Sequence, residues 1–347
     1  MTKRYQYGIC GVFDFEEHAT GGQSVKTREF YYALCNQVGK NNISILESSS
    51  YKKNPVSFLF RFALLMSQCE TTVLFPAQKG VKVFAPLCYL LKKICYTKTY
   101  YNVIGGWIAQ MVDENPILKL FLADFDCILV ETNCMKNELE KRGITNVRRL
   151  RNFKRLTPIE ESKIKDVDFP IRLCYFSRVT KMKGIDDAVK AVKKINQDKV
   201  QCTLDIYGPI TDGYEEEFKI LEKGFGKEIT YKGKINPSNS VDVISKYDIQ
   251  LFPTHYKTEG IPGAVIDSYF AGVPIVAARW NSFEDVILEE ITGVGYEIDN
   301  CDSLFRALYN LVNDKERIEQ MKHGALHEAS KYMEDSVIKE FITMAKE

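Results

Sequence analysis

The sequence predicts an α/β protein with two doubly wound domains that face each other across a cleft. Along all 347 residues, short runs of β-branched and aromatic residues alternate with amphipathic stretches, which is typical of βαβ units around parallel sheets. The length suits two domains of ordinary size. A polar stretch over 152–168 separates two such series, and a new strand begins at Ile171. The predicted domains are therefore 1–155 and 156–331, followed by a terminal helix within 332–347.

In the first half, strands are expected where β-forming residues run between turn residues, and helices where apolar residues recur every three or four positions. The expected strands cover 7–13, 43–47, 71–75, 100–104, 127–131 and 146–150. The expected helices cover 23–39, 56–68, 114–123 and 133–142. Ligands of doubly wound sheets bind outside the carboxyl ends of the strands, so the loops after these strands are the first places to look for a site.

The second half follows the same rules, with Gly272-Val273-Pro274 as a helix stop before a buried-type strand. The expected strands cover 171–176, 202–207, 229–232, 248–252, 274–278 and 294–298. The expected helices cover 184–196, 214–225, 237–246, 262–271, 282–290, 302–313, 315–331 and 334–346. With two facing sheets, the cleft that they share is the expected binding site.

The composition narrows the classes of function. A hydrophobic share of 45% and a charged share of 27% are ordinary for a globular protein, and the net charge of +1 gives no indication of nucleic-acid binding. Ten cysteines are dispersed without the spacing of zinc or redox motifs, which predicts free buried thiols in a reducing cytoplasm. The polar first residues do not resemble a signal peptide. We therefore expect a cytoplasmic protein without a bound metal.

Basic charge gathers in the first half. Residues 1–160 carry 22 Lys and Arg against 14 Asp and Glu, whereas the remaining residues carry 25 against 32. Within 48–104 there are eight basic residues and one acid, Glu70. The segments 52–66 and 90–98 mix these cations with apolar residues, so each is either a core helix with a charged rim or a peripheral contact with an anionic membrane surface. The charge imbalance favours a peripheral contact, either with the inner face of the membrane or with a lipid diphosphate.

The stretch 259–278 contains the most informative motif of the chain. Glu259 opens a glycine-containing loop, and Pro262 suits the first position of the helix that follows. Exposed amides at such a helix start bind phosphate. Asp267 follows Glu259 by eight positions, about two helical turns or ~12 Å of rise. Two separated carboxylates around a phosphate site suit a sugar nucleotide, which has a sugar at one end and a ribose at the other.

This motif resembles the donor-binding signature of retaining glycosyltransferases of the family 4 type, which have the GT-B fold. The family pattern is a Glu, seven residues and a second Glu, followed by Ala-Gly-Xaa-Pro-Val; here it is Glu259, Asp267 and Ala271–Ile275. The Asp is one methylene shorter than the family's Glu. The resemblance implies an acceptor-binding first domain, a donor-binding second domain and a last helix that packs back on the first. It also implies catalysis without a metal or other cofactor.

A second motif follows the strand 171–176. Arg178 and Lys183 flank the turn before Gly184, where two cations can clamp a diphosphate. The family has an Arg, four residues and a Lys-Gly at this place, and the resemblance implies that Arg178 and Lys183 bind the donor diphosphate. With Glu259, which would orient the donor sugar, they are the predicted catalytic residues. The alternative interpretation is an ordinary basic turn.

The resemblance implies further donor contacts, each of which has a plain turn or loop as its alternative. Thr254 would either bond the donor phosphate or cap a turn, Asp267 would hold the ribose, and the backbone of the Glu259 loop would contact the sugar. A Gly-Gly pair after the first strand would contact the donor phosphates across the cleft. The predicted donor-binding residues are Gly21, Gly22, Gly208, Lys234, Ile235, Thr254, Gly260, Ile261, Pro262, Gly263 and Asp267.

The predicted function is transfer of a sugar from a nucleotide sugar, a UDP-sugar by the family's habit, to a hydroxyl of a glycan or lipid-linked saccharide. The product would belong to a microbial surface polysaccharide, and the anomeric configuration would be retained. Two alternatives remain open. One is a GT-B enzyme that epimerises or phosphorolyses sugars. The other is a catalytically inactive subunit that binds a nucleotide sugar within a complex.

Overall fold

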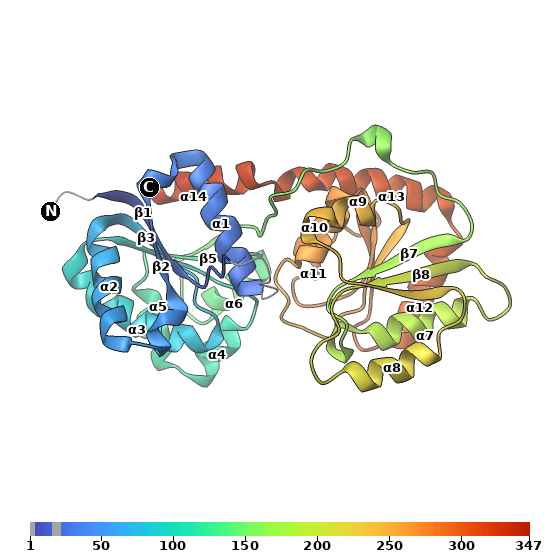
Figure 1. Cartoon of the computed structure of the whole chain (residues 1–347), viewed down its shortest axis with the longest axis horizontal. Coiled ribbons are helices and arrows are strands. Elements are labelled where there is room, and N and C mark those ends of the chain that lie inside the picture. Colours follow the sequence, from blue (N-terminus) through green and yellow to red (C-terminus); the bar gives the residue numbers. More distant parts are fainter. Residues whose placement is uncertain (1–3, 16–21) are drawn as a thin grey trace. The chain divides into compact units, whose positions relative to one another are not determined.

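The computed structural model describes residues 4–15 and 22–347, which form two compact units. The first unit contains residues up to Arg155 together with Glu334–Glu347, and the second contains Leu156–Met333 (Figure 1). The sequence places the second boundary at 331/332, two residues earlier. Each unit has one six-stranded sheet in which all neighbouring strands are parallel. This is the two-domain α/β architecture that the alternation of elements predicts.

The first sheet has the strand order β2-β1-β3-β4-β5-β6. Its strands are β1 (Tyr5–Gly11), β2 (Ile43–Glu47), β3 (Cys69–Leu74), β4 (Lys98–Asn102), β5 (Cys127–Val130) and β6 (Val147–Arg149). Its helices are α1 (Gly22–Val38), α2 (Pro55–Gln68), α3 (Gln78–Cys95), α4 (Ile108–Glu114), α5 (Ile117–Ala123) and α6 (Asn133–Lys141), joined by the chain's last helix, α14 (Glu334–Lys346). Helices α1 and α14 share one apolar cluster with the sheet, and α2 to α6 share another, so both faces are covered.

The second sheet has the strand order β12-β11-β10-β7-β8-β9. Its strands are β7 (Ile171–Phe176), β8 (Cys202–Tyr207), β9 (Ile229–Gly233), β10 (Ile249–Phe252), β11 (Ile275–Ala278) and β12 (Gly293–Tyr296). Its helices are α7 (Ile185–Ile195), α8 (Glu215–Lys223), α9 (Ser240–Ile244), α10 (Gly263–Phe270), α11 (Phe283–Val286), α12 (Cys301–Val312) and α13 (Lys315–Glu328). Helices α7, α8 and α12 cover one face, and α9, α10 and α11 cover the other.

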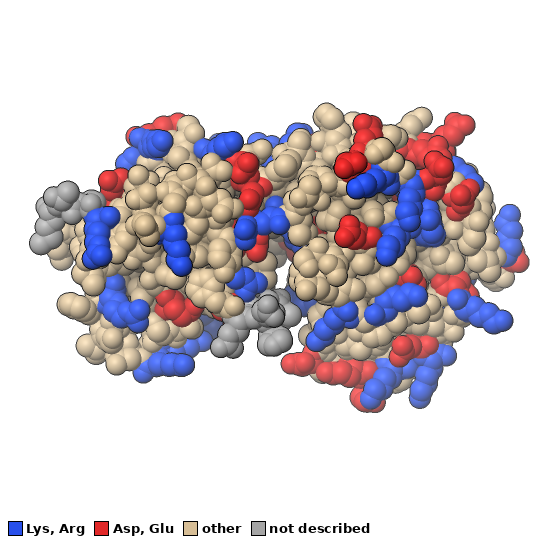
Figure 2. All heavy atoms as spheres, turned by 45° about the horizontal axis from the view of Figure 1, so that its top comes forward, with Lys and Arg blue, Asp and Glu red and all other residues tan. Residues whose placement is uncertain are grey.

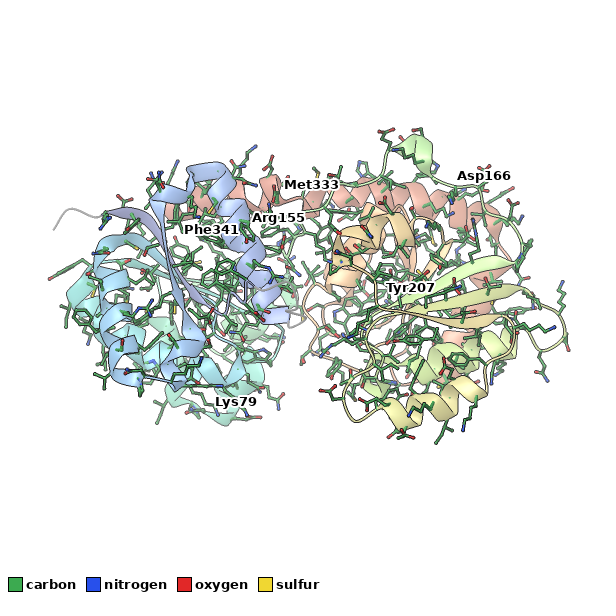
Figure 3. The ribbon with its side chains drawn as sticks, in the orientation of Figure 1. Lys79, Arg155, Asp166, Tyr207, Met333 and Phe341 are labelled. Atoms are coloured by element: carbon green, nitrogen blue, oxygen red, sulfur yellow. The ribbon has the colours of Figure 1, made fainter. Side chains whose placement is uncertain are left out.

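Helix α14 belongs to the core of the first unit although it is the last element of the chain. The ring of Phe341 lies 4.9 Å from that of Phe30 and 5.8 Å from those of Tyr7 and Tyr100, measured between ring centroids (Figure 3). Arg155 binds Glu334 at 2.8 Å at the start of the helix. Residues from β1, α1 and β4 therefore hold the C-terminal segment in place.

Several predicted elements differ from those of the structure. Between 75 and 100 the sequence allows a core helix only as one interpretation of 90–98, yet α3 spans 18 residues there with Pro86 inside it. Its buried side chains fill the space beside α2 and α5, and this packing outweighs the backbone hydrogen bond that Pro86 cannot make. The helix predicted over 114–123 corresponds to α5, which begins only at Ile117, after Pro116, and the preceding helix α4 was not predicted. The helix predicted over 282–290 extends only through Phe283–Val286.

Candidate functional site

Four of the predicted site residues of the second unit lie in the two loops at the switch point of its sheet. Strand β7 lies between β8 and β10, so the connections after β7 and β10 leave the sheet in opposite directions. Ligands of doubly wound sheets bind at the carboxyl ends of two such strands. The loop after β7 carries Arg178 and Lys183, and the loop after β10 carries Thr254 and Glu259. The topology therefore brings the two motifs of the sequence to one place.

Close backbone contacts fix the two loops against each other. Gly184 has a φ of +74°, and a Cβ built there would lie 1.7 Å from the carbonyl oxygen of Pro253. Only glycine can therefore occupy this turn without displacing the neighbouring loop. The amide of His255 also donates to the carbonyl oxygen of Met182 at 3.0 Å. These contacts place the side chain of Lys183 over the residues that follow β10.

Lys183 and Glu259 form an ion pair between Nζ and Oε1. Their side chains are 11% and 18% exposed, so the pair is largely shielded yet still open to solvent. The hydroxyl of Thr254 donates to the same Oε1 at 3.2 Å. The Nζ atom also lies 5.4 Å from the ring centroid of Phe252 and 5.2 Å from that of Tyr256. An ammonium group has three donors, so Lys183 can bind an oxyanion while it keeps its bond to Glu259.

Arg178 is exposed at the end of the same turn. The buried hydroxyl of Tyr175 lies 2.9 Å from the carbonyl oxygen of Arg178 and 3.3 Å from that of Lys183, so it ties both ends of the turn to β7. Within the part of the chain that the structure describes, no acidic side chain forms an ion pair with Arg178. Its guanidinium is therefore available for an anionic ligand.

Helix α10 begins one residue later than predicted. Pro262 stands before the helix with an extended backbone (ψ of 135°), and Gly263 is the first helical residue. No side chain caps this end, so the first backbone amides of the helix are available to an anion. Gly260, Ile261 and Pro262 are buried in the loop between Glu259 and the helix. Because Glu259 lies in this loop, the two carboxylates are not two turns apart on one helix.

Asp267 lies inside α10 and is 1% exposed. Its Oδ1 accepts a hydrogen bond of 3.0 Å from the hydroxyl of Ser240, at the start of α9. The structure thus brings Asp267 together with α9, whereas Glu259 is paired with Lys183. A ribose contact requires a carboxylate oxygen that faces a ligand, and the role predicted for Asp267 stays a prediction.

The loops after β8 and β9 hold the remaining predicted donor contacts. The amide of Gly208 donates to the carbonyl oxygen of Gly233 at 3.0 Å, and the hydroxyl of Tyr231 donates to that of Gly208 at 2.8 Å. Gly208 also packs closely against the loop after β7. A Cβ built at Gly208 would lie 1.8 Å from the carbonyl oxygen of Ser177. Lys234 is exposed and Ile235 half-buried, just after the end of β9. The structure places these turns next to the switch point, and their contact with a base stays a prediction.

The predicted Gly-Gly pair belongs to the first unit. Gly22 is the first residue of α1, and Gly21 lies outside the described residues. The loop between β1 and α1 starts at the switch point of the first sheet, where β1 lies between β2 and β3. This position agrees with the rule for ligand-binding loops, and the contact with donor phosphates stays a prediction.

Two charged groups near the carboxyl ends of the strands were not found from the sequence. Lys26 donates to Oε1 of Glu131 at 2.6 Å and to the carbonyl oxygen of Val103 at 2.8 Å, at the carboxyl end of the first sheet. In the second unit, His255 contacts Asp187 at 3.1 Å and Asp299 at 2.6 Å. The partners of both groups are far apart in the sequence, so no local spacing could have indicated them.

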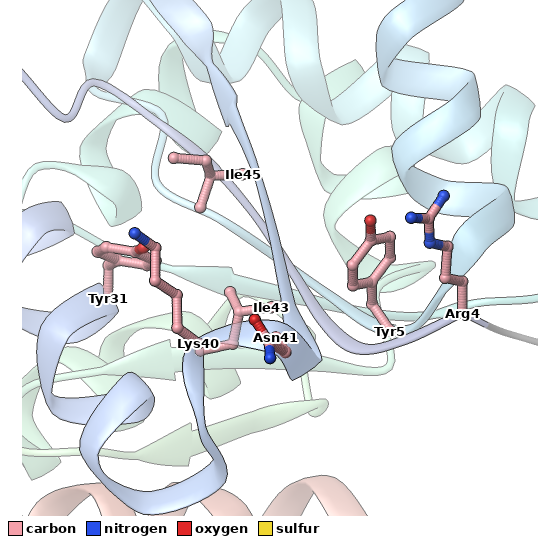
Figure 4. Close-up of a pocket in the computed structure, with 7 residues that line it drawn as sticks. All are labelled: Arg4, Tyr5, Tyr31, Lys40, Asn41, Ile43 and Ile45. Atoms are coloured by element: carbon pink, nitrogen blue, oxygen red, sulfur yellow. The ribbon is translucent and has the colours of Figure 1, made fainter.

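A hollow elsewhere in the first unit is not part of this site. It has a volume of about 430 Å³ and is lined by residues from the amino ends of β1 and β2 and from the segments beside them (Figure 4). Its lining residues are Arg4, Tyr5, Tyr31, Lys40, Asn41, Ile43 and Ile45. None of them is a predicted site residue, and ligands of such sheets bind at the carboxyl ends, so we base the candidate site on the switch point.

The comparisons with known proteins match most of the second unit to one family. Residues 159–327 match the family described as Glycosyl transferases group 1. The match lies within the second unit and includes Arg178, Lys183, Glu259 and Asp267. A protein of Methanocaldococcus jannaschii named as an uncharacterized glycosyltransferase is 23% identical over 228 residues. The alignment covers 64% of this chain and 52% of the relative, so the chain spans about half of that relative's length.

Solved structures resemble the whole chain. Sucrose-phosphate synthase from Thermosynechococcus elongatus has a TM-score of 0.78 and 13% identity, with 99% of this chain and 98% of that chain covered. HepE from Anabaena, solved in complex with UDP-glucose, has a TM-score of 0.73 and 11% identity, with 98% and 99% covered. At these identities the likeness shows the fold alone. It confirms the predicted GT-B type of α/β fold.

Proposed function

We propose that this protein is a retaining glycosyltransferase that takes its sugar from a nucleoside diphosphate. The observation that carries the proposal is the convergence of Lys183, Thr254 and Glu259 at the switch point of the second sheet. The family match over 159–327 supports it, because the match includes these residues. A UDP-sugar is the proposed donor, in line with the UDP-glucose bound by HepE.

In the proposed reaction, the bond between the anomeric carbon and the diphosphate oxygen breaks, and the diphosphate leaves with the electron pair. Arg178 and Lys183 stabilise the negative charge that develops on it, and the free amides at the start of α10 add to this field. The acceptor hydroxyl oxygen bonds to the anomeric carbon and loses its proton to the departing phosphate. Retention of configuration is proposed from the resemblance of the Glu259–Asp267 motif. These protein cations take the part that a metal plays in other transferases, so we propose catalysis without one.

Glu259 is proposed to orient the donor sugar. Its Oε1 binds Lys183 and Thr254, which leaves the other carboxylate oxygen free to accept a hydrogen bond from a sugar hydroxyl. The same ion pair holds Lys183 over the turn where the diphosphate would lie. The acceptor is proposed to be a glycan or lipid-linked saccharide of a microbial surface polysaccharide.

Incubation with a panel of radiolabelled nucleotide sugars tests the proposal. We expect slow release of free sugar and nucleoside diphosphate from one donor, and Arg178→Ala and Lys183→Ala should each lower that rate by about 10²-fold, as for lost donors to a transition-state oxyanion. Lys190→Ala, an exposed cation on α7, is the matched control and should keep the rate. An epimerised nucleotide sugar would favour an epimerase, and tight binding without turnover would favour an inactive subunit. Unchanged rates in both site variants would contradict the proposal.

A further inference from the structure

The outer surface of α2 and α3 exposes many apolar side chains. Of the 21 large apolar side chains that are exposed among the described residues, ten lie between 56 and 120. They are Val56, Leu59, Phe60, Leu64, Val83, Leu90, Ile94, Tyr96, Ile117 and Leu120. Scattered exposed apolar residues are normal, but a contiguous group of them marks an interaction surface. The position of these residues on their helices decides which case applies.

On α2 the exposed apolar residues form one stripe. Phe58, Phe62 and Leu65 are buried and face the sheet. Val56 is 79% exposed and Phe60 is 72% exposed, and Leu59 and Leu64 accompany them on the opposite side. These four positions fall within less than half of the helix circumference at 100° per residue. The helix is therefore apolar on its outer side as well as on its core side.

On α3 a second stripe repeats at helical spacing. Val83, Leu90 and Ile94 are exposed, and half-buried Leu87 lies between them, so the four residues recur every three or four positions. The inner side, with Phe84 and Cys88, packs in the core. This stripe also points outward.

The two stripes adjoin each other. Sγ of Cys95 lies 3.7 Å from the carbonyl oxygen of Ala63. Ala63 stands between Phe60 and Leu64 of the first stripe, and Cys95 directly follows Ile94 of the second. We call the combined surface the α2–α3 face; its members are Val56, Leu59, Phe60, Leu64, Val83, Leu87, Leu90 and Ile94.

Unpaired cations border the α2–α3 face. They are Lys52, Lys53, Lys79, Lys82 and Lys93, which are all exposed and form no ion pair within the described residues. Lys79, at the start of α3, is labelled in Figure 3 at the lower edge of the first unit. Figure 2 shows acidic side chains mainly on the second unit, whereas the visible surface of the first has broad uncharged areas with separate basic side chains.

Two lysines of the segment 90–98 do not belong to this border. Lys92 pairs with Asp126 at 2.9 Å and donates to the carbonyl oxygen of Asp124. Lys98 starts β4, and its Nζ donates to the carbonyl oxygen of Ala345. Both side chains are held inside the first unit. The segment 90–98 that the sequence predicts as a membrane contact therefore extends too far at its C-terminal end. Only its residues on the outer side of α3, which ends at Cys95, belong to the α2–α3 face or its border.

We propose that the α2–α3 face docks on a bilayer surface that contains anionic lipids. Such a surface has an apolar acyl region beneath a layer of anionic headgroups. The apolar side chains of the α2–α3 face would enter the boundary of the acyl region, and the unpaired lysines around them would bind the headgroups. None of the described helices has the length and apolar character needed to cross a bilayer, so the contact is peripheral in kind. The inference goes beyond the proposed sugar transfer and does not depend on it.

Co-sedimentation with vesicles tests this inference without any assay of activity. The full chain is expected to bind vesicles of phosphatidylglycerol and phosphatidylcholine at low ionic strength, and to bind pure phosphatidylcholine more weakly. Replacing Lys53, Lys79 and Lys82 with Ser should weaken binding to the anionic vesicles about five-fold per charge, and added salt should do the same. Phe60→Ser with Ile94→Ser should weaken it by about ten-fold or more per side chain.

Matched controls come from the second unit. Lys199, Lys227 and Lys246 are exposed and form no ion pair among the described residues, and their replacement with Ser removes the same number of charges. Ile220 and Val200 are 71% and 59% exposed and serve as the apolar control. Both controls should leave vesicle binding unchanged.

Three outcomes would overturn the inference. The first is a wild-type protein that does not bind the anionic vesicles at low ionic strength. The second is an equal loss of binding in the control variants. The third is a dimer in sedimentation velocity that Phe60→Ser with Ile94→Ser abolishes while vesicle binding is unaffected, which would assign the α2–α3 face to a second copy of the chain.

Discussion

Asp267 and Glu259 have different surroundings although one motif contains both. Glu259 lies in a loop, is partly open to solvent and is paired with a cation. Asp267 is 1% exposed inside α10 and accepts from the hydroxyl of Ser240. A carboxylate so deeply buried needs hydrogen-bond donors around it to remain stable. At the scale of single residues, Asp267 therefore contributes to the packing of α9 on α10, whatever it contacts in a complex.

Asp267→Ala is expected to lower the free energy of unfolding by about 1–3 kcal/mol, because it leaves the buried hydroxyl of Ser240 without this acceptor. Ser240→Ala is the matched variant, since it removes the same hydrogen bond from the other side. If Asp267 also holds the ribose, only Asp267→Ala should weaken nucleoside diphosphate binding, by about 1.5–3 kcal/mol in calorimetry. Equal affinity in the two variants would contradict the ribose contact.

A second buried carboxylate, Asp248, is held by two cations at the opposite end of the sheet. Arg172 donates to it from Nε and Nη2, at 2.9 and 2.8 Å, and Lys322 donates at 2.8 Å. Burial alone would raise the pKa of Asp248, but the hydrogen bonds from Arg172 and the charge of Lys322 outweigh it and hold this pKa below its usual value. Burial is also the main cause that lowers the pKa of Lys322.

Asp248→Asn is expected to cost about 3–5 kcal/mol of unfolding free energy at neutral pH, because Lys322 then remains buried without its anionic partner. Since the pKa of Asp248 is lowered by folding, its contribution is complete above the unfolded value of ~3.9 and is lost as the pH falls through the folded pKa. Urea unfolding of both proteins against pH should therefore show a difference that shrinks below about pH 4. A difference that stays constant down to low pH would disprove this account. Lys322→Met should cost less, because Arg172 still pairs with Asp248.

At the scale of elements, the candidate site depends on how two loops fit. The turn before α7 and the loop before α10 meet where Gly184 passes the carbonyl oxygen of Pro253. His255 adds a backbone bond to Met182. The two loops belong to different βα units, and their contact places Lys183 beside Glu259. Any change that separates them should remove the ion pair and the site together.

Gly184→Ala should disrupt this contact. Its cost has two parts: about 1–2 kcal/mol for a left-handed backbone with a Cβ, and a further part for the overlap with Pro253. Gly213→Ala is the control for the first part, because Gly213 has a φ of +85° and open space where a Cβ would lie. Thermal unfolding should show the larger loss for Gly184→Ala, and calorimetry should show weakened nucleoside diphosphate binding in this variant alone. Equal effects of the two substitutions would show that the loops do not depend on their close approach.

At the scale of the whole molecule, the chain forms two units and crosses between them twice, after Arg155 and after Met333. Each unit has its own sheet and its own apolar clusters. The last helix completes the first unit through Phe341 and through hydrogen bonds from Lys98 and Tyr100 to its final turns. The first unit is therefore incomplete until α14 has been synthesised.

Phe341→Ala should destabilise the first unit by about 3–5 kcal/mol, because it leaves a cavity among Tyr7, Phe30 and Tyr100. The two tryptophans report on the units separately: Trp107 lies in the first and Trp280 in the second. In a Trp280→Phe background, the fluorescence of Trp107 should show that Phe341→Ala makes the first unit unfold earlier. In a Trp107→Phe background, the fluorescence of Trp280 should show a much smaller change in the unfolding of the second unit. Phe218→Ala, in the core of the second unit, is the matched control and should reverse the pattern. Equal shifts of both transitions would mean that the units unfold as one.

The sequence by itself determined the order of the strands along the chain, the GT-B class of fold and the four residues that lie at the switch point. These features follow from local periodicity and from short motifs, because a strand, a helix start or a turn is specified by residues close together in the chain. The extent of α3 around Pro86 was missed, since packing against α2 and α5 overrides the local cost of proline.

Only the tertiary structure decided which side chains meet. The pairing of Asp267 with Ser240 and the contacts of His255 with Asp187 and Asp299 join residues from separate elements. The pattern of apolar and charged residues along the chain predicts secondary structure. It does not predict whether a given side chain will contact the core, another loop or solvent. The surroundings of a side chain are decided when the strands take their order in the sheet, because this order determines which loops and helices become neighbours. The strand order in turn depends on free-energy differences summed over the whole domain.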